Sequence, residues 1–340
     1  MKIGIEGVAY SLGSNQLTNS ALNLENPSWE MAAIQERSGV SSRPVAGLSE
    51  TALDMGERAA KDLLEKLGLL SEEFDALIFC SQTPDYILPP NSSLLHARLG
   101  MTHDVMAFDI THACSGFVYG LGIGNSLVQS GTASRILLIT ADTYTRLIHP
   151  EDRSTRPIFG DGAAATVISA IKPAITFLDM AFGTAGKYAT RFIIKNGGSR
   201  YPKDDYLKTR VDKSGRILSD KHIFMDGLGL LSFFSNQIPK AVNEILFRNR
   251  LSIDDISLFV FHQASKLALD GLQRNLRIPK EKMYLGLRDF GNLVSASIPV
   301  SLASIISSRK IQPGQLMLLS GFGVGLSWGT ILVRVEAFRG

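Results

Sequence analysis

The stretch DITHACSGFVYGLGIG, residues 109–124, carries the pattern on which the fold prediction rests. Small residues recur through it at helical spacing, at Ala113, Gly116, Gly120 and Gly124. An apolar approach followed by this spacing predicts a strand, a sharp turn and a buried helix, because glycines allow other backbone to pass close to a helix. Cys114 falls near the predicted helix N-terminus, which favours negative charge and is expected to lower the pKa of the thiol. The alternative is a small apolar core cysteine, since free cysteines are often buried.

The composition is that of a globular protein with a sizeable core. The chain has 340 residues, of which 45% are hydrophobic and 20% charged, enough for one large or two moderate domains. The net charge is +3 without long runs of like charge, so nucleic acid is not predicted as a partner. The two cysteines, Cys80 and Cys114, favour a reducing compartment. The start of the chain lacks a signal-peptide pattern, and no stretch reaches the roughly 18 unbroken apolar residues of a membrane span. We therefore predict a cytoplasmic protein.

The order of local patterns alternates strands with helices. The sequence predicts a strand over residues 3–9, a helix over 51–67 and a strand over 135–142, with a loop-like segment around Trp29 between the first two. This alternation is typical of an α/β protein with mainly parallel sheets.

The two halves of the chain resemble each other. Two pairs of segments align at nearly the same offset: residues 59–83 with 241–264, and residues 130–141 with 310–321. The same offset carries Cys114 close to Ser295, so a second central helix is expected to begin there. Self-similarity at one offset indicates duplication. We predict two pseudo-symmetric halves, residues 1–172 and 173–340, whose central helices pack together.

Pseudo-symmetry predicts where a site would form. Sites in open α/β units lie outside the carboxyl ends of strands. An apolar strand of the second half ends at His262, and Asn292 lies in the loop before the second central helix. Both loops are expected to approach Cys114, which favours a nucleophilic thiol over a core cysteine.

Five motifs in this order resemble the β-ketoacyl-ACP synthase III family of thiolase-fold condensing enzymes, where ACP is acyl carrier protein. They are ACSGF at Cys114, DRSTRPIFGDGAAA (152–165), HQAS at His262, GNLVSASIP (291–299) and GFGVGLSWG (321–329). The resemblance runs along the whole chain. It implies a thiolase-like fold with two α/β halves and buried central helices in a five-layer αβαβα arrangement.

The resemblance implies a catalytic triad of Cys114, His262 and Asn292. An acyl group would move from acyl-CoA or acyl-ACP to the cysteine, and malonyl-ACP would then lose CO₂ and attack the acyl thioester. Two donors aimed at one oxygen, from His262 and Asn292, suit the enolate that decarboxylation produces. The backbone N–H groups of Cys114 and Val324 would hold the acyl carbonyl.

Other positions follow from the resemblance alone. Trp29, Arg37 and Arg153 match residues that bind the adenine and phosphates of CoA. The alternative for Trp29 is a packing role, and the alternative for Arg153 is an ion pair with Asp152 or Asp161. Leu88 matches a side chain that enters the acyl pocket of a dimer partner, which implies a homodimer. No metal and no redox cofactor are implied.

Three positions depart from the family pattern. Leu228 and Ser265 stand where the pantetheine channel usually has asparagines, which leaves acyl-ACP open as the donor. Val324 stands where the family has a third glycine, and it still has a backbone N–H that can donate a hydrogen bond. A basic stretch after His262, from Lys266 to Lys282, is either a solvated helix face or a docking site for an acidic carrier protein.

Several alternatives stay open. His112 is a rival base two residues before Cys114, although such a neighbour points away at a helix start. A papain-like protease also has the order Cys, His, Asn, but its local motifs are absent and the repeat would be unexplained. A thiolase-fold acyltransferase would pass the acyl group to a hydroxyl or amine in a specialised pathway. A non-catalytic subunit is disfavoured because Cys114, His262 and Asn292 are all present.

Overall fold

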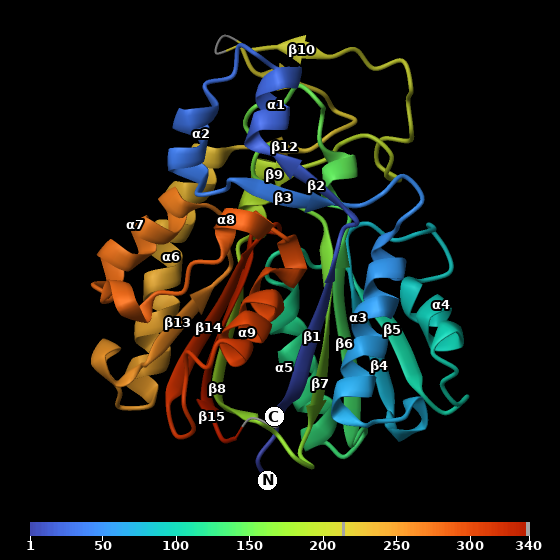
Figure 1. Ribbon diagram of the computed structural model, residues 1–340, viewed down its shortest axis with the longest axis vertical. Helices are drawn as coiled ribbons and strands as arrows, with labels where there is room; N and C mark the ends of the chain where they lie inside the picture. Colours follow the sequence, from blue (N-terminus) through green and yellow to red (C-terminus); the bar gives the residue numbers. More distant parts are fainter. Residues whose placement is uncertain (213–214, 338–340) are drawn as a thin grey trace.

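The computed structural model describes residues 1–212 and 215–337, and its framework is a large mixed sheet. The strands of this sheet are β1 Gly4–Leu12, β4 Ala76–Cys80, β5 Met106–Ile110, β6 Arg135–Asp142, β7 Gly162–Ser169, β8 Ile175–Thr184, β13 Leu258–Phe261, β14 Leu316–Gly323 and β15 Ser327–Val335. They lie in the order β13-β14-β15-β8-β1-β7-β6-β4-β5. The first half of the chain therefore supplies one end of the sheet, and the second half supplies the other (Figure 1).

The two half-sheets are joined by a short contact between their innermost strands. β1 pairs with β7 along its length and with β8 only at Gly4 and Ile5. The sheet is mixed and not mainly parallel as predicted, since β7 and β15 both run antiparallel to their neighbours. The connection from β14 to β15 covers only residues 324–326. A connection this short permits only an antiparallel neighbour, because a parallel one needs a crossover.

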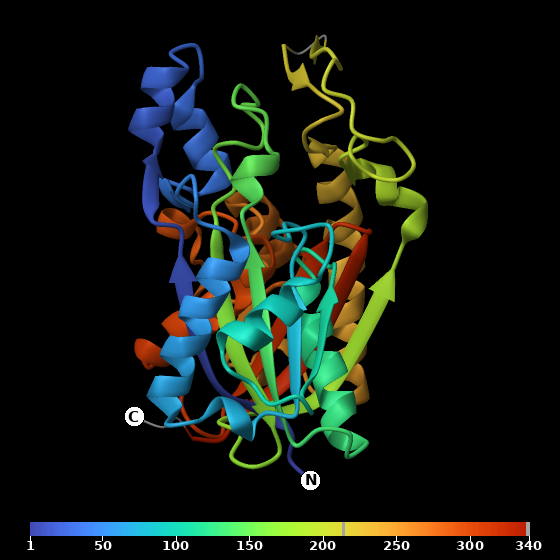
Figure 2. The same ribbon diagram turned by 90° about the vertical axis from the view of Figure 1, so that its right-hand side faces the viewer.

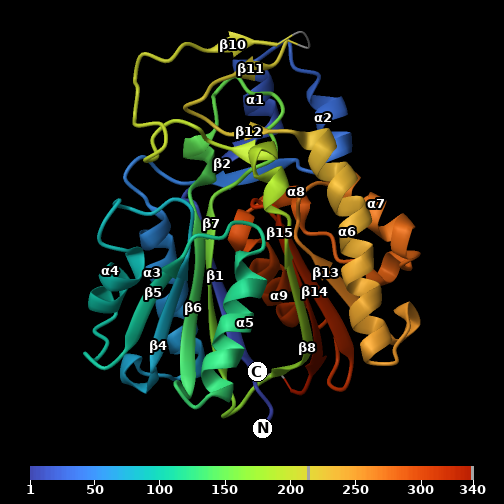
Figure 3. The same ribbon diagram turned by 180° about the vertical axis from the view of Figure 1, so that it is seen from behind.

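Two central helices lie between the half-sheets. They are α5 (Gly116–Gln129) and α9 (Ser297–Ser307). Phe117 and Leu121 of α5 are buried in one cluster with Ile298 and Leu302 of α9 and with strands of both halves. Outer helices cover the other faces: α3 (Ala52–Leu67) and α4 (Asn91–Arg98) on one side, α6 (Gly227–Arg248) and α7 (Lys266–Leu276) on the other (Figures 1 and 3). The five-layer arrangement that the sequence predicted is confirmed.

The internal repeat is also present in the structure. The aligned segments form matching elements: α3 with α6, β4 with β13, β6 with β14. Ser295 lies in a short 3₁₀ turn, Val294–Ala296, directly before α9, as Cys114 lies directly before α5. The boundary at residue 172 between two units stays a prediction, because hydrogen bonds between β1 and β8 join the halves.

A cap of short elements stands over one end of the sheet (Figure 2). Its elements are β2 Asn15–Thr18, α1 Asn19–Glu25, α2 Met31–Ser38, β3 Ser42–Val45, β9 Phe192–Ile193, β10 Arg210–Val211, β11 Ile217–Leu218, β12 Phe224–Met225 and, at its base, α8 Leu287–Phe290. Trp29 lies in the turn between α1 and α2, but the loop-like segment predicted around it is too long, since these two helices flank that turn. Thr18 caps α1 by accepting a hydrogen bond from the Ala21 N–H, and β2 pairs with β3 across the intervening helices. This pairing is a tertiary contact that local periodicity does not reveal.

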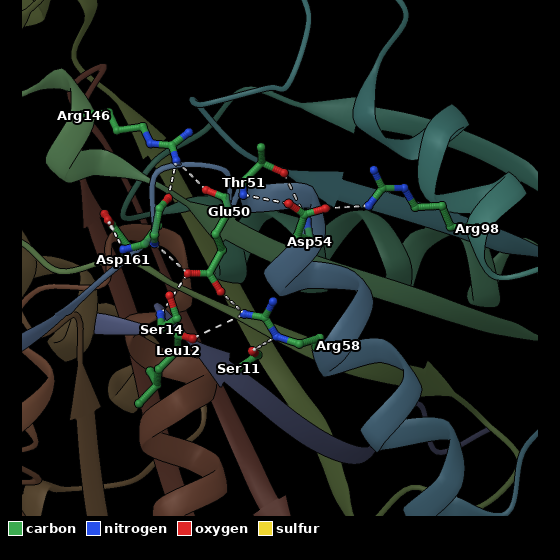
Figure 4. A network of polar contacts seen from close by, with 12 residues as sticks. Ser11, Leu12, Ser14, Glu50, Thr51, Asp54, Arg58, Arg98, Arg146 and Asp161 are labelled. Carbon is green, nitrogen blue, oxygen red and sulfur yellow. Dashed lines mark hydrogen bonds and ion pairs between the residues drawn. The ribbon is translucent and has the colours of Figure 1, made fainter. Parts of the chain in front are cut away.

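Hydrogen bonds tie the loop before α3 to the loops beneath the cap (Figure 4). The Glu50 carboxylate accepts hydrogen bonds from the Ser14 and Gly47 N–H groups and pairs with Arg58. Arg146 donates to the carbonyls of Gly47 and Glu50 at 2.8 and 2.6 Å. These contacts hold the loops at the carboxyl ends of the first-half strands in fixed positions. Across the described residues, no helix combines the length and apolar character needed to cross a membrane.

The β1–β8 junction generates a stability prediction. A Cβ atom added at Gly4 would lie 1.9 Å from the Ile175 carbonyl oxygen, which is backbone and cannot rotate away. We expect Gly4→Ala to lower the free energy of unfolding by about 1–3 kcal/mol, as overpacking does elsewhere. Urea unfolding followed by circular dichroism measures the change. The matched control is Gly198→Ala, where an added Cβ meets nothing within 4 Å; equal stability of the two variants would contradict the packing argument.

Candidate active site

A cavity of about 480 Å³ opens beneath the cap, and side chains from both halves of the chain line it. Cys114 comes from the start of α5, His262 from the end of β13, and Asn292 from the loop after α8. The cavity therefore brings together the three side chains that pseudo-symmetry predicted would meet. Most of the remaining wall is apolar and includes Phe159, Phe192 and Leu230.

Cys114 lies on the turn that starts α5, with its side chain at the cavity wall. It is 4% exposed. The end of β14 passes so close that a Cβ atom at Gly323 would lie 2.7 Å from the Cys114 Cβ, and one at Gly321 would lie 3.0 Å from the Cys114 carbonyl oxygen. Glycine is required at both positions because any side chain would displace the turn that carries Cys114.

Burial, and not the helix terminus, dominates the ionisation of this thiol. Loss of solvation raises the pKa of Cys114, and the buried carboxyl group of Asp142 raises it further, whereas the backbone N–H of Cys114 acts in the opposite direction. The lowered pKa expected from the helix N-terminus is therefore wrong. The terminus lies where predicted, but the burial of the thiol outweighs its partial charge.

His262 follows β13 and is held at both its backbone and its ring. Its N–H donates to the Ser320 carbonyl at 2.8 Å, and its ring packs edge-on against Phe322. Burial lowers the pKa of His262 to about 3. The imidazole is thus neutral at physiological pH and carries one N–H donor. Its Nδ1 atom has no hydrogen-bond partner among the described residues.

The Asn292 amide is oriented by its own loop. The backbone of Asn292 pairs with the chain at Ile158 and Gly160. Its Oδ1 atom accepts a hydrogen bond from the Val294 N–H at 2.9 Å. Because the carbonyl end of the amide is engaged in this way, the NH₂ end is the free donor that Asn292 presents at the cavity wall.

A buried carboxyl group connects the Asn292 loop to the first half of the chain. Asp142, at the end of β6, accepts hydrogen bonds from the Gln82 N–H at 2.8 Å and from the Ser295 hydroxyl at 2.6 Å. Burial raises the pKa of Asp142 to about 7, although these hydrogen bonds oppose the rise. Sequence analysis missed Asp142. The available signal was a lone acid at the end of the apolar strand 135–142.

Aromatic rings pack beside the Cys114 thiol. Tyr144 and Phe159 belong to one buried cluster with Cys114, and their ring centroids are 5.4 Å apart. The Tyr144 hydroxyl donates to the Gln82 side-chain oxygen at 2.6 Å. This bond fixes the ring beside the nucleophile.

Of the three residues matched to CoA binding, two line the cavity and one does not. Arg37 and Arg153 line the cavity. Trp29 does not line it, and its indole is buried with Leu22 and Met31, which is the packing alternative. Sequence analysis missed a third cavity arginine, Arg216, because it lies in the cap far from any motif.

The three positions that depart from the family pattern lie in the cavity wall or beside Cys114. Leu228 and Ser265 line the cavity, and the Ser265 hydroxyl caps α7 by accepting from the Ala268 N–H. Val324 packs in the cluster around Cys114. Leu88 is 79% exposed on the loop after β4.

The two competing side chains, His112 and Cys80, do not line the cavity. The His112 ring packs against Tyr119, with centroids 4.2 Å apart, and is not part of the cavity wall. Cys80 is buried and donates its thiol to the His112 carbonyl. Across the residues that the structure describes, no group of three or more His, Cys, Asp and Glu side chains is arranged to hold a metal ion.

Comparison with protein families matches two segments of the chain. The family described as 3-oxoacyl-[acyl-carrier-protein] synthase III matches residues 108–186, which include Cys114. The family described as the C-terminal part of 3-oxoacyl-[acyl-carrier-protein] synthase III matches residues 246–335, which include His262 and Asn292.

Individual proteins extend the likeness to nearly the whole chain. The β-ketoacyl-[acyl-carrier-protein] synthase III of Porphyra purpurea is 36% identical over 303 residues, covering 88% of this chain and 90% of that protein. A crystal structure of a 3-oxoacyl-(acyl-carrier-protein) synthase III is 35% identical with a TM-score of 0.94, covering 98% of this chain and 100% of the other. The synthase of Burkholderia xenovorans is 31% identical with a TM-score of 0.90, covering 99% and 95% of the two chains.

The raised pKa of Cys114 generates a pH prediction. A thiol whose pKa lies above its ordinary value stays protonated at neutral pH, so its thiolate fraction grows about tenfold per pH unit up to that pKa. We expect the rate of iodoacetamide alkylation of Cys114 to rise by about this factor per unit between roughly pH 7 and pH 9. Peptide mass spectrometry measures it, with Cys80→Ala removing the second thiol. A plateau reached by about pH 7 would instead indicate a stabilised thiolate.

Proposed function

The chain belongs to the 3-oxoacyl-[acyl-carrier-protein] synthase III family, and we propose that Cys114, His262 and Asn292 carry out the chemistry of that family in this protein. The protein is a condensing acyltransferase that joins an acyl group to a malonyl unit with loss of CO₂. One observation carries the assignment of the residues. A thiol and two neutral hydrogen-bond donors from both halves of the chain line a single, largely apolar cavity.

The first step is thioester exchange at Cys114. Its sulfur attacks the carbonyl of the acyl donor and forms a new C–S bond, while the thiolate of CoA or of the carrier protein leaves and takes up the proton of Cys114. The exchange therefore needs no net acid or base. The backbone N–H groups of Cys114 and Val324 are the proposed donors to the carbonyl oxygen, and Gly323 lets that backbone approach.

The second step is decarboxylation of malonyl-ACP. The bond to the carboxylate breaks, CO₂ leaves, and the electron pair forms an enolate whose oxygen is negative. The Nε2–H of His262 and the amide of Asn292 would donate to this oxygen. A neutral imidazole suits the role because it donates without transferring its proton, and the lowered pKa of His262 supports this state. The enolate carbon then attacks the acyl-Cys114 carbonyl, forming the new C–C bond and releasing the Cys114 thiolate.

The acyl donor is proposed to carry a phosphorylated pantetheine arm, as CoA and ACP both do. Arg37 and Arg153 in the cavity wall support this because guanidinium groups pair with phosphate. The cavity wall at Leu228 and Ser265 differs from the family pattern, which has asparagines there. Leu228 has no side-chain amide, and the Ser265 hydroxyl already caps α7. We therefore propose fewer polar contacts to the amide groups of the arm in this protein.

We also propose a homodimer. The supporting observation is a partly uncovered apolar face: Met106 of the edge strand β5 and Leu178 and Phe182 of β8 are each 38–42% exposed. In Figure 3, α5 lies at the front of the molecule with no helix over it. In such a dimer Leu88, which projects from the loop after β4, would reach the acyl pocket of the second copy.

The function is tested by intact-protein mass spectrometry with a panel of acyl-CoAs and acyl-ACPs. We expect a mass gain on the Cys114 peptide, discharged by malonyl-ACP with formation of a β-ketoacyl-ACP. The best donor in the panel identifies the primer. A label removed by an alcohol or amine but not by malonyl-ACP would support acyl transfer to those acceptors instead.

Single variants separate the two steps. Cys114→Ala is expected to abolish labelling, and Cys80→Ala, the matched control, to retain it. His262→Ala and Asn292→Ala should still accept the acyl group but lose about 10²–10³-fold in malonyl decarboxylation, as expected for removal of one donor to a developing oxyanion. Unchanged decarboxylation in both variants would refute the roles assigned to these side chains.

The dimer is tested by sedimentation velocity. We expect the particle mass to be twice the 37.0 kDa of the chain. Replacing Phe182 with Asp would place a charge in the proposed interface and should shift the protein toward the single-chain mass, because burying an unpaired charge is costly. A wild-type protein that sediments with the single-chain mass would rule out the dimer.

A further inference from the structure

Arg216 is a cavity residue that the proposed chemistry does not use. It lies between β10 and β11 in the cap and lines the same cavity as Cys114, Arg37 and Arg153. Its side chain is only 16% exposed. Among the described residues, its Nε and Nη2 atoms have no hydrogen-bond partner. Buried guanidinium nitrogens without partners are costly, because the lost hydrogen bonds to water are not replaced.

Two contacts hold the Arg216 guanidinium group in position, and neither involves a charged partner. Its Nη1 atom donates to the Met225 carbonyl at 2.8 Å, and its guanidinium group lies over the Phe224 ring, 5.4 Å from the ring centroid. Both contacts come from β12, the neighbouring strand of the cap. The guanidinium group is therefore fixed at the cavity wall before any ligand binds.

The carboxylate that pairs with the Arg216 guanidinium group is already engaged with other donors. Asp152 Oδ2 lies 3.7 Å from Arg216 Nη2, which is an ion pair but too long for a hydrogen bond. The same oxygen accepts from the Thr155 hydroxyl at 2.7 Å, while Oδ1 accepts from the Ser154 N–H and hydroxyl. A purely structural ion pair would satisfy Arg216 with direct hydrogen bonds, and this one does not.

A second arginine of the same hairpin shows the contrast. Arg210, on β10, has a 63% exposed side chain and donates to Asp220 at 3.2 Å. It does not line the cavity. Arg210 is an ordinary surface cation, whereas Arg216 faces the cavity and keeps donors unused.

We propose that Arg216 binds a phosphate group of the acyl donor, as a third guanidinium beside Arg37 and Arg153. The inference rests on the proposed function, because it takes the ligand of this cavity to be a phosphorylated pantetheine thioester. Phosphate oxygens match the fork of guanidinium N–H groups and form charge-assisted hydrogen bonds with it. The cap thus contributes to donor binding through a residue outside the motifs of the family. Arg216 compensates for the apolar cavity wall at Leu228 by recognising the charge of the donor.

The experiment compares three probes that differ in phosphate. Isothermal titration calorimetry gives the dissociation constants of CoA, 4′-phosphopantetheine and pantetheine for the wild type, Arg216→Gln and Arg216→Lys. We expect Arg216→Gln to weaken binding of phosphate-bearing probes by about 10- to 100-fold, the range for a lost charged hydrogen bond. Arg216→Lys should recover part of the loss because it keeps the charge. Arg210→Gln is the matched control and should bind as the wild type does.

The probes decide which phosphate is bound and whether the inference stands. A loss confined to CoA assigns Arg216 to the nucleotide end, and an equal loss for CoA and 4′-phosphopantetheine assigns it to the phosphate they share. Equal weakening of pantetheine, or no weakening of any probe, would overturn the inference while leaving Cys114 labelling and condensation intact. If the wild type bound none of the probes, the inference and the proposed donor would both fail, and acylation of Cys114 by other thioesters would remain measurable.

Discussion

The packing of α5 against α9 between the two half-sheets is the constraint on which the rest of the structure depends. The two central helices begin beside each other, since a Cβ atom added at Gly116, the first residue of α5, would lie 3.6 Å from the Cβ of Ser295, just before α9. The end of β14 can approach Cys114 only because Gly321 and Gly323 lack side chains. Cys114 is consequently held by contacts from both halves, and its position depends on the fold as a whole and not on one loop.

The same packing sets the electrostatics of the site. Excluding water raises the pKa of Cys114 and lowers that of His262, so both groups rest in their neutral forms. A cysteine protease relies on a thiolate stabilised by a neighbouring imidazolium. Here the environment disfavours both charges, and a neutral imidazole with the Asn292 amide is suited to receive a negative oxygen that develops during reaction. The hydrogen bond from Ser295 to Asp142 anchors the loop that carries Asn292.

The cap adds charged side chains to the cavity that the central layers form. Its segments come from residues 15–45 and 192–225 and converge over the carboxyl ends of the strands (Figure 2). They bring arginines to a cavity whose remaining wall is largely apolar. The central layers therefore supply Cys114, His262 and Asn292, and the cap supplies Arg37 and Arg216 of the cavity wall.

The sequence by itself predicted the alternation of strands and helices, the internal repeat, and the meeting of Cys114, His262 and Asn292 at one cavity. These features leave local marks: apolar periodicity, glycines at helical spacing, and polar residues at strand ends such as His262. It did not determine α1 and α2, the mixed direction of the strands, the burial of Trp29 away from the cavity, or the roles of Asp142 and Arg216. Each of these depends on contacts between distant segments, such as the pairing of β2 with β3. The tertiary structure also reversed the expected pKa shift of Cys114, because a helix terminus is visible in sequence, whereas the depth of burial that outweighs it exists only once the chain has folded.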